Sequence, residues 1–113
     1  MSIFSTLFCS KSDKDNIIKV LDILEFKAQT QSKKVQLVDV RTPEEFNSGH
    51  IQNAINIDSS SEEFNLEFSA LNKNEAVYVY CRSGARSRRC ANKLAGMGFM
   101  EIYDLKGGIL NYK

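Results

Sequence analysis

The chain has few of the residues that usually build disulfide scaffolds or metal sites. Its 113 residues include three cysteines, one histidine, one proline and six glycines, and they include no tryptophan. Three cysteines cannot all pair within one chain, and they fit neither a disulfide framework nor a four-ligand zinc cage. One histidine leaves little room for a histidine-rich metal site. We therefore expect no metal and no cofactor, and a reducing, cytoplasmic compartment in which at least one thiol is chemically active.

An excess of one charge and long apolar runs are also missing. Fifteen Lys and Arg oppose fourteen Asp and Glu, so the formal net charge is +1. This balance argues against binding to nucleic acid or to a membrane surface through the overall charge of the chain, although it allows a local basic patch. No apolar run approaches the ~20 residues that cross a bilayer. We therefore expect neither nucleic acid nor membrane as a partner.

The length is that of one domain, which buries roughly two thirds of the surface of its unfolded chain. The first ten residues contain four large apolar side chains besides Met1, but no Lys or Arg precedes Lys11, and Phe8 comes directly before Cys9. That pattern fits neither a secretory signal nor a lipoprotein cleavage box well. We expect an amphipathic or loose tail at residues 1–16 and one folded domain at residues 17–113, monomeric by default.

Short apolar runs mark five strands along the chain. They cover residues 17–20, 35–40, 54–57, 76–80 and 101–105. Helical segments separate them, and this alternation predicts an α/β protein with a five-stranded parallel sheet and helices on both faces. In such sheets ligands bind beyond the carboxyl ends of the strands. The segments that follow the second and fourth strands are therefore the places to look for a site.

The first helix is predicted directly after the first strand. Asp22 and Glu25 have the spacing of a capping box, and Leu24 and Ala28 are expected on one face of the helix that follows. Residues 29–34 are expected to form a polar connection to the second strand.

Three further helices are predicted between the remaining strands. Pro43 begins the first at its favoured position, and Gly49 ends it. Serines at 59–61 offer caps for the second, and the third covers residues 85–97. The apolar faces of the second and third helices are expected to contain Phe64, Phe68, Leu71, Cys90, Ala91 and Leu94.

The fourth strand runs directly into the segment CRSGARS, residues 81–87, which precedes a helix. Backbone N–H groups that converge in a tight turn, together with a helix N-terminus, form a cradle for an anion. Gly84 permits the unusual backbone that such a turn needs, and Arg86 supplies a fixed, forked positive charge. A thiol at the mouth of this cradle, Cys81, should have a lowered pKa. The alternative, an ordinary buried cysteine at a strand end, does not explain this combination.

The chain resembles the single-domain rhodaneses, a family of sulfurtransferases. The resemblance rests on DVRTPEEFNSGHIQNAINI (39–57), on CRSGARS (81–87) and on GGILNY (107–112), in family order and spacing over about residues 17–112. It implies a three-layer α/β fold with a five-stranded parallel sheet. It also implies that Cys81 accepts a sulfane sulfur as a persulfide and passes it to a thiol, cyanide or a protein.

The same resemblance implies that the loop binds the substrate. The expected binding residues are Arg82, Ser83, Gly84, Ala85, Arg86 and Ser87, with Cys81 as the catalytic nucleophile. The expected partners are a small anionic sulfur donor and a thiol or protein acceptor. Further basic residues follow on the helix predicted at residues 85–97. They extend the positive field of the loop, or they simply form the solvated face of that helix: Arg88, Arg89 and Lys93.

Two other functions are possible for this fold. Cysteine phosphatases and arsenate reductases need the spacing C-x5-R, whereas here Arg86 gives C-x4-R and Ser87 occupies the phosphatase position. The shorter loop favours a single sulfur atom over a tetrahedral phosphate. A non-catalytic binding or regulatory module would usually lack the cysteine, so Cys81 argues against that alternative.

The chain departs from the family pattern at three places. Asn53 stands where glycine is frequent, but Asn also tolerates positive φ. Tyr112 stands near the closing turn where the family often has Trp, and a ring of similar role is expected to pack there. The chain ends at Lys113, without the extra residues of many relatives.

The remaining cysteines and the histidine are predicted to be structural. Cys90 is too far along the helix to pair with Cys81 and is expected to fill the core, while Cys9 is an incidental thiol of the tail. His50 is a conceivable general base, but a turn residue that bonds nearby backbone or a carboxylate is the favoured interpretation.

Polar and aromatic residues of the second and fourth strands have two interpretations each. Asp39 and Arg41 brace the rim of the site, or they satisfy N–H groups at a strand end. Tyr78 and Tyr80 alternate with valines, which favours strand packing over a platform for stacking bases.

Overall fold

A computed structural model describes residues 16–112. The tail predicted at residues 1–16, with Cys9, lies outside the described residues except for Asn16, and so does Lys113. Within the described part of the chain, no helix is long and apolar enough to span a membrane.

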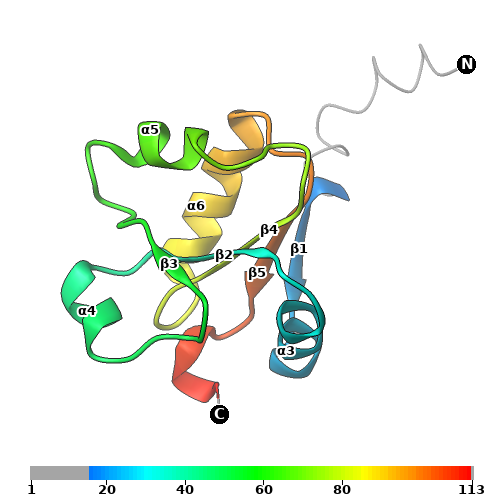
Figure 1. Cartoon of the computed structure of the whole chain (residues 1–113), viewed down its shortest axis with the longest axis vertical. Helices are drawn as coiled ribbons and strands as arrows, with labels where there is room; N and C mark the ends of the chain where they lie inside the picture. The colour runs from blue at the N-terminus through cyan, green and yellow to red at the C-terminus, as the bar shows by residue number, and fades with distance from the viewer. Residues whose placement is uncertain (1–15, 113) are drawn as a thin grey trace, which may run out of the picture.

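The predicted α/β fold is confirmed, with five parallel strands in the order β1-β5-β4-β2-β3 (Figure 1). The strands are β1 (Ile18–Leu21), β2 (Gln36–Asp39), β3 (Ile55–Asn56), β4 (Val77–Tyr80) and β5 (Ile102–Leu105). The helices are α3 (Ile23–Ser32), α4 (Pro43–Asn47), α5 (Phe64–Ser69) and α6 (Ala85–Gly96), followed by the 3-10 helix η1 (Gly108–Asn111).

Strand β4 lies in the middle of the sheet and divides the core into two layers. Its side chains alternate between the faces, so Val77 and Val79 belong to one cluster and Tyr78 and Tyr80 to the other. All four residues are buried, which is expected of a central parallel strand that helices cover on both sides.

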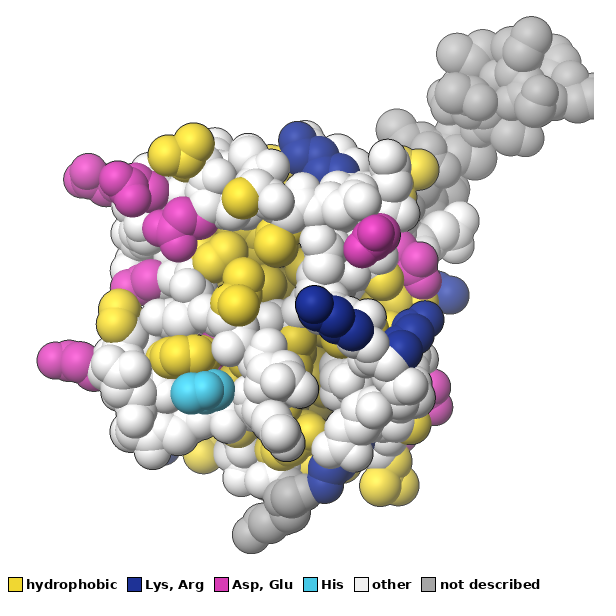
Figure 2. Space-filling model, in the orientation of Figure 1, with side chains coloured by type: hydrophobic (Ala, Val, Ile, Leu, Met, Phe, Trp, Pro, Cys, Tyr) yellow, Lys and Arg dark blue, Asp and Glu magenta, His cyan; other side chains and the backbone are white. Residues whose placement is uncertain are grey.

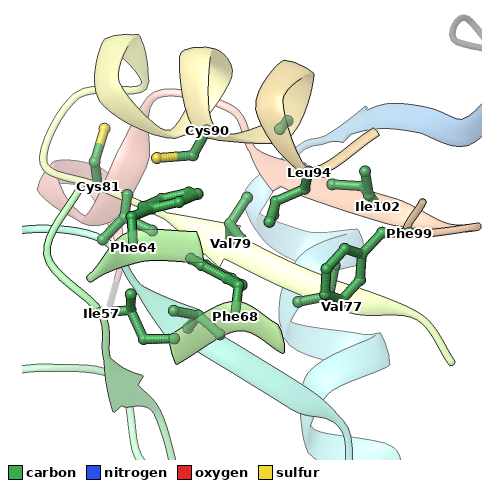
Figure 3. Packing of buried hydrophobic residues seen from close by; sticks show 13 residues of the cluster. Ile57, Phe64, Phe68, Val77, Val79, Cys81, Cys90, Leu94, Phe99 and Ile102 are labelled. Carbon is green, nitrogen blue, oxygen red and sulfur yellow. The ribbon is translucent and has the colours of Figure 1, made fainter. Parts of the chain in front are cut away.

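The first face of the sheet packs against α5 and α6. Phe64 and Phe68 of α5 meet Cys90, Ala91 and Leu94 of α6 over the valines of the sheet, as the sequence predicts. Figure 3 shows this cluster, with Cys81 at its edge and Cys90 on the helix beside it.

The second face packs against α3 and the C-terminal segment. Phe26 of α3 is fully buried and contacts the ring of Tyr78 edge-on, at 5.7 Å between centroids. Tyr78 in turn stacks on Tyr103, at 4.8 Å. These contacts confirm that Tyr78 is a packing residue, and Tyr80 is fully buried in the same cluster.

One prediction about α3 is confirmed and another is wrong. Leu24 and Ala28 share a face as predicted, and that face is exposed, with Leu24 76% accessible. The expected polar connection at residues 29–34 is largely helical, because the helix continues to Ser32. Its N-terminus is capped as predicted, since the Asp22 carboxylate accepts a hydrogen bond from the N–H of Glu25 at 2.9 Å.

The start of α5 also differs from expectation. The helix begins at Phe64 without a side-chain cap, and the Ser61 hydroxyl instead accepts from the N–H of Glu63 in the preceding turn. Phe64 and Phe68 still reach the core. Figure 2 shows one face of the molecule, and apolar side chains gather at the surface in the middle of it.

Candidate active site

Cys81 follows the last residue of β4 and occupies the floor of the predicted cradle. Its side chain is 1% exposed, and the backbone N–H of Gly84 donates to its Sγ at 3.0 Å. Gly84 caps α6 with φ of +110°, a conformation that residues with a Cβ rarely adopt. The turn therefore depends on glycine at this position, and the first turn of α6 starts directly above the thiol.

The cradle stabilises a thiolate despite the burial of Cys81. Burial alone raises the pKa of the thiol, because it disfavours the charged form. The Ser87 side chain and the backbone N–H groups of Ser87, Gly84 and Ser83 act against burial, and together they hold the pKa of Cys81 below its ordinary value. The predicted lowering of the Cys81 pKa thus has its origin in hydrogen bonds, without a histidine.

Ser87 connects the cradle to β5. Its hydroxyl donates to Oδ1 of Asp104 at 2.5 Å and lies 3.3 Å from the carbonyl oxygen of Gly84. Both Ser87 and Asp104 are fully buried. Sequence reasoning missed Asp104, since nothing in its local pattern distinguishes it from any strand residue.

Arg86 is held by a carboxylate of α4. Its guanidinium makes two parallel hydrogen bonds to Glu45, at 2.8 and 3.0 Å, and about three tenths of each side chain remains exposed. The Glu45 carboxylate also accepts from the N–H of Thr42 and so completes the capping box of α4. The hydrogen bond from Arg86 holds the pKa of Glu45 at about 2.

The other predicted loop residues differ in exposure. Arg82, Ser83 and Ala85 are exposed, whereas Gly84 and Ser87 are buried. The structure therefore brings one side chain, Ser87, into the interior beside Cys81 and leaves Arg82 at the surface of the loop.

The C-terminal segment forms a wall of the loop. The N–H of Ile109 donates to the carbonyl oxygen of Cys81 at 2.9 Å, and the N–H of Leu110 donates to that of Arg82 at 3.2 Å. A Cβ at Gly108 would lie 2.3 Å from the Arg82 carbonyl oxygen, so only glycine fits. The Gly-Gly pair was the sequence signal for this contact.

Asp39 and Arg41 form a buried ion pair at the carboxyl end of β2. The Arg41 guanidinium lies 2.6 Å from Asp39 Oδ2 and also donates to the carbonyl oxygen of Gly49 at 2.7 Å. Asp39 additionally accepts from the N–H of Arg41 at 2.9 Å. The pair thus satisfies a strand end and also anchors the turn that leads towards β3.

Cys90 and His50 have the structural roles predicted for them. Cys90 is a free, buried thiol, and burial raises its pKa to about 12. The Nδ1 atom of His50 lies 2.9 Å from the carbonyl oxygen of Phe46, and the two rings stack at 3.7 Å.

The two expected compensations for departures from the family pattern are present. Asn53 has φ of +73° and so adopts the conformation in which glycine is frequent. Tyr112 packs against the second core cluster, with the Nζ atom of Lys27 5.0 Å from the centre of its ring.

No alternative site of comparable chemistry is present in the described residues. A hollow of about 1030 Å³ lies between α3 and residues 51–53, and no residue of the loop lines it. Within residues 16–112, no three His, Cys, Asp or Glu side chains are grouped as metal ligands. The cradle around Cys81 is therefore the candidate site.

The family model for the rhodanese-like domain matches residues 22–113 of the chain. The chain belongs to the rhodanese-like domain family. Its Cys81 loop, five parallel strands and closing glycine turn are accordingly the features of a rhodanese-like domain.

Relatives and solved structures agree with this family. The chain is 41% identical to the Bacillus subtilis protein YqhL, over 84% of this chain and 72% of YqhL. It is 32% identical to the thiosulfate sulfurtransferase GlpE of Shewanella oneidensis, over 80% of this chain and 87% of GlpE. The crystal structure of a rhodanese-like domain protein from Staphylococcus aureus has a TM-score of 0.74 and 33% identity, over 84% of this chain and 91% of that one.

Several relatives are longer proteins. The chain is 33% identical to the tRNA uridine(34) hydroxylase of Pelagibacter ubique over 91% of its own length, but it spans only 34% of that hydroxylase. The similarity therefore concerns the rhodanese-like part alone.

Proposed function

We propose that this rhodanese-like domain is a sulfurtransferase that carries a sulfane sulfur on Cys81. The observation that supports this most is the lowered pKa of a buried thiol surrounded by N–H and hydroxyl donors. A thiolate is the reactive form of cysteine, and the same donors suit the anionic outer sulfur of a persulfide. Similarity to the thiosulfate sulfurtransferase GlpE supports the same reaction.

The reaction proceeds in two displacements at sulfur. The Cys81 thiolate attacks the outer sulfur of thiosulfate, a new S–S bond forms, and sulfite leaves with the electron pair of the broken bond. A thiol, cyanide or protein acceptor then attacks the outer sulfur of the persulfide, and the Cys81 thiolate is the leaving group. Neither displacement requires an external oxidant, and the covalent intermediate divides the transfer into two easier steps.

The loop residues have distinct proposed roles. Gly84, Ser83 and Ser87 stabilise the sulfur anion through their donors, and Arg82 attracts the anionic donor from the surface. Arg86 orders the loop through Glu45 and adds positive charge beside it. Ala85 begins α6, whose N-terminus faces the bound sulfur.

The setting of the reaction is also a proposal. We propose a cytoplasmic monomer that uses a small anionic or persulfide donor and a thiol or protein acceptor, with no metal, cofactor, nucleic acid or membrane involved. The C-x4-R spacing disfavours phosphate and arsenate chemistry, and the presence of Cys81 disfavours a purely regulatory module. A hydroxylase function is not proposed, because the chain spans about a third of those relatives.

Intact-protein mass spectrometry tests the proposal. After incubation with thiosulfate and removal of excess donor, the protein should gain the mass of one sulfur atom, and subsequent cyanide should remove it. Cys81→Ser should gain nothing, while Cys90→Ala, the matched control at the other buried thiol, should gain the same mass as wild type.

The proposal fails if wild type gains no sulfur from thiosulfate or from a small-molecule persulfide. Hydrolysis of an aryl phosphate that is lost in Cys81→Ser would instead support the phosphatase alternative. Stable capture of a protein partner that is unaffected by Cys81→Ser, without any sulfur uptake, would support a binding module.

A further inference from the structure

Asp104 is a buried carboxylate whose position the fold alone does not explain. It lies on β5 beneath α6 and is fully buried. Its Oδ1 accepts the short hydrogen bond from Ser87, but its buried Oδ2 has no hydrogen-bond partner among the described residues. The Nε atom of Arg88 lies 3.5 Å from Oδ2, and the Arg88 side chain is 58% exposed. A buried carboxylate anion that is only half satisfied is costly, whereas the protonated acid is much less so.

Ser87 acts on both this carboxyl group and the nucleophile. Its hydroxyl has one hydrogen and two lone pairs, so it can donate to one partner at a time. Asp104 accepts that hydrogen at 2.5 Å, yet the Ser87 side chain is also the strongest contributor to the lowering of the Cys81 pKa. The two groups therefore compete for one proton.

We propose that Asp104 is a positioning residue that controls the ionisation of Cys81 through Ser87. The proposal rests on the proposed function, since it assigns a partner to the nucleophile of that reaction. The network has two states with the same number of protons.

In the resting state Asp104 is ionised, Ser87 donates to Asp104, and the Cys81 thiol donates to the Ser87 oxygen. In the reactive state the Cys81 proton has moved to Ser87 Oγ while the Ser87 proton has moved to Asp104 Oδ1. The protonated Asp104 then donates to Ser87, and Ser87 donates to the Cys81 thiolate. The proton stays within the protein while the thiolate attacks a donor, so the interior carries one negative charge in both states.

The surroundings of Asp104 agree with this exchange. Desolvation raises the pKa of Asp104, although Ser87 and Arg88 oppose the rise. Its partners in the neighbouring strands are Val20 of β1 and Val79 of β4, which carry no titratable group. The groups that act on Asp104 are Ser87 and Arg88 of α6. Asp104 in turn contributes to the raised pKa of Cys90 on the same helix.

The decisive measurement is the pH dependence of Cys81 alkylation by iodoacetamide, with the labelled cysteine located by peptide mass spectrometry. Asp104→Asn keeps the size and a hydrogen-bonding side chain but removes the negative charge. The apparent pKa of Cys81 should fall by about one pH unit in this variant. In wild type, complete ionisation of Cys81 removes the proton that it shares with Asp104 and leaves two negative charges, whereas in Asp104→Asn it leaves only one. An unchanged midpoint would overturn the proposal, because a merely structural Asp104 changes stability and not this titration.

A double-mutant cycle tests whether the coupling passes through Ser87. Ser87→Ala should raise the Cys81 pKa, because the hydroxyl donor is lost, and Ser87→Thr should restore the wild-type midpoint. In the Ser87→Ala background, Asp104→Asn should change the midpoint by less than half as much as in wild type. Equal shifts in both backgrounds would overturn the role of Ser87 as the link.

Carbon-13 NMR of the unmodified protein gives the same test without a substitution at Asp104. The Asp104 carboxyl carbon should report an inflection at the midpoint at which the Cys81 Cβ titrates, because the two groups share one proton. If the Asp104 carboxyl carbon showed its only inflection at the low pH of an ordinary aspartate, the proposal would be overturned. These measurements use no sulfur donor, so their outcome is independent of whether the protein transfers sulfur.

Discussion

Glycines with no tolerated replacement shape the cradle around Cys81. Gly84 turns the chain above the thiol with positive φ, and Gly108 brings the C-terminal segment against the Arg82 carbonyl. Both positions require a backbone that lacks a Cβ, one for conformation and the other also for space. The precision of the loop therefore depends on two residues that supply no functional group.

Gly108→Ala should impair sulfur loading as well as stability. The added Cβ would meet the Arg82 backbone at 2.3 Å, and φ of +69° is unfavourable for alanine, so we expect a loss of roughly 2–4 kcal/mol in unfolding free energy. Urea unfolding gives the stability, and the rate of sulfur uptake from thiosulfate, per folded molecule, should fall at least about tenfold.

Gly49→Ala is the matched control. Gly49 also has positive φ, at +144°, but a Cβ there would meet nothing within 4 Å. This variant should lose stability while keeping normal loading. Equal loading in Gly108→Ala and wild type would show that the C-terminal wall does not shape the loop.

At the level of elements, α4 and α6 are locked together by one carboxylate. Glu45 accepts from the Thr42 N–H at the start of α4 and binds the Arg86 guanidinium at the start of α6. The N-terminal ends of two helices on different parts of the chain thus share Glu45 as a common acceptor. A capping residue of one helix thereby orders the Cys81 loop that precedes the other.

Glu45→Gln should weaken the protein in a pH-dependent manner. The pKa of Glu45 is lowered to about 2, so its carboxylate stabilises the fold above the unfolded-state pKa near 4.5, and this contribution disappears as pH falls towards 2. We expect a deficit of about 1 kcal/mol at pH 7, because the pair is partly exposed, and the deficit should shrink by pH 3. Urea unfolding at both pH values measures it.

Glu44→Gln provides the control on the same turn of α4. Glu44 is exposed, and the hydrogen bonds to Thr42 and Arg86 come from Glu45 instead. Glu44→Gln should change the free energy of unfolding little, and by the same amount at pH 7 as at pH 3. A pH-independent deficit in Glu45→Gln would contradict the role of the ion pair.

At the scale of the whole molecule, near-neutral charge conceals an uneven distribution. The net charge is +1, yet four arginines lie between positions 82 and 89. Arg86 pairs with Glu45 and Arg88 approaches Asp104, whereas Arg82 and Arg89 are exposed and form no salt bridge within residues 16–112. The unpaired charges therefore remain available to attract an anion to the mouth of the cradle.

Sulfur uptake from thiosulfate should consequently slow as salt increases. Raising the ionic strength from about 0.05 M to about 0.5 M screens the attraction, and the wild-type rate should fall several-fold. Arg82→Gln should be slower at low salt and less sensitive to salt. Stopped-flow or quenched uptake followed by mass spectrometry measures both.

Lys19→Gln removes the same charge from β1 and serves as the control. Lys19 is exposed and lies on the edge strand, so its loss should leave both the rate and the salt dependence near wild type. If Arg82→Gln and Lys19→Gln behaved alike, general net charge and not the local arginine would govern donor capture.

Patterns of adjacent residues were sufficient to predict much of this molecule. Strand alternation around Tyr78 and Tyr80, the Pro43 helix start, the positive φ of Asn53 and the loop after β4 are local properties of the chain. Leu24 shows the limit of such patterns, because an apolar helical face does not state whether another element will cover it. Phe26 is buried instead, since the second sheet face lies on that side of α3.

Seven consecutive residues contain the thiol, its glycine turn and the spacing to Arg86. The sequence by itself therefore determined the candidate nucleophile and the preference for sulfur over phosphate that we propose. Which groups surround that thiol depends on contacts between distant segments. Glu45 lies 41 residues from Arg86, and Asp104 lies 17 residues from Ser87. Parallel strands bring their carboxyl ends to one edge of the sheet, and only that assembly puts a carboxylate beneath Ser87 and another beside Arg86.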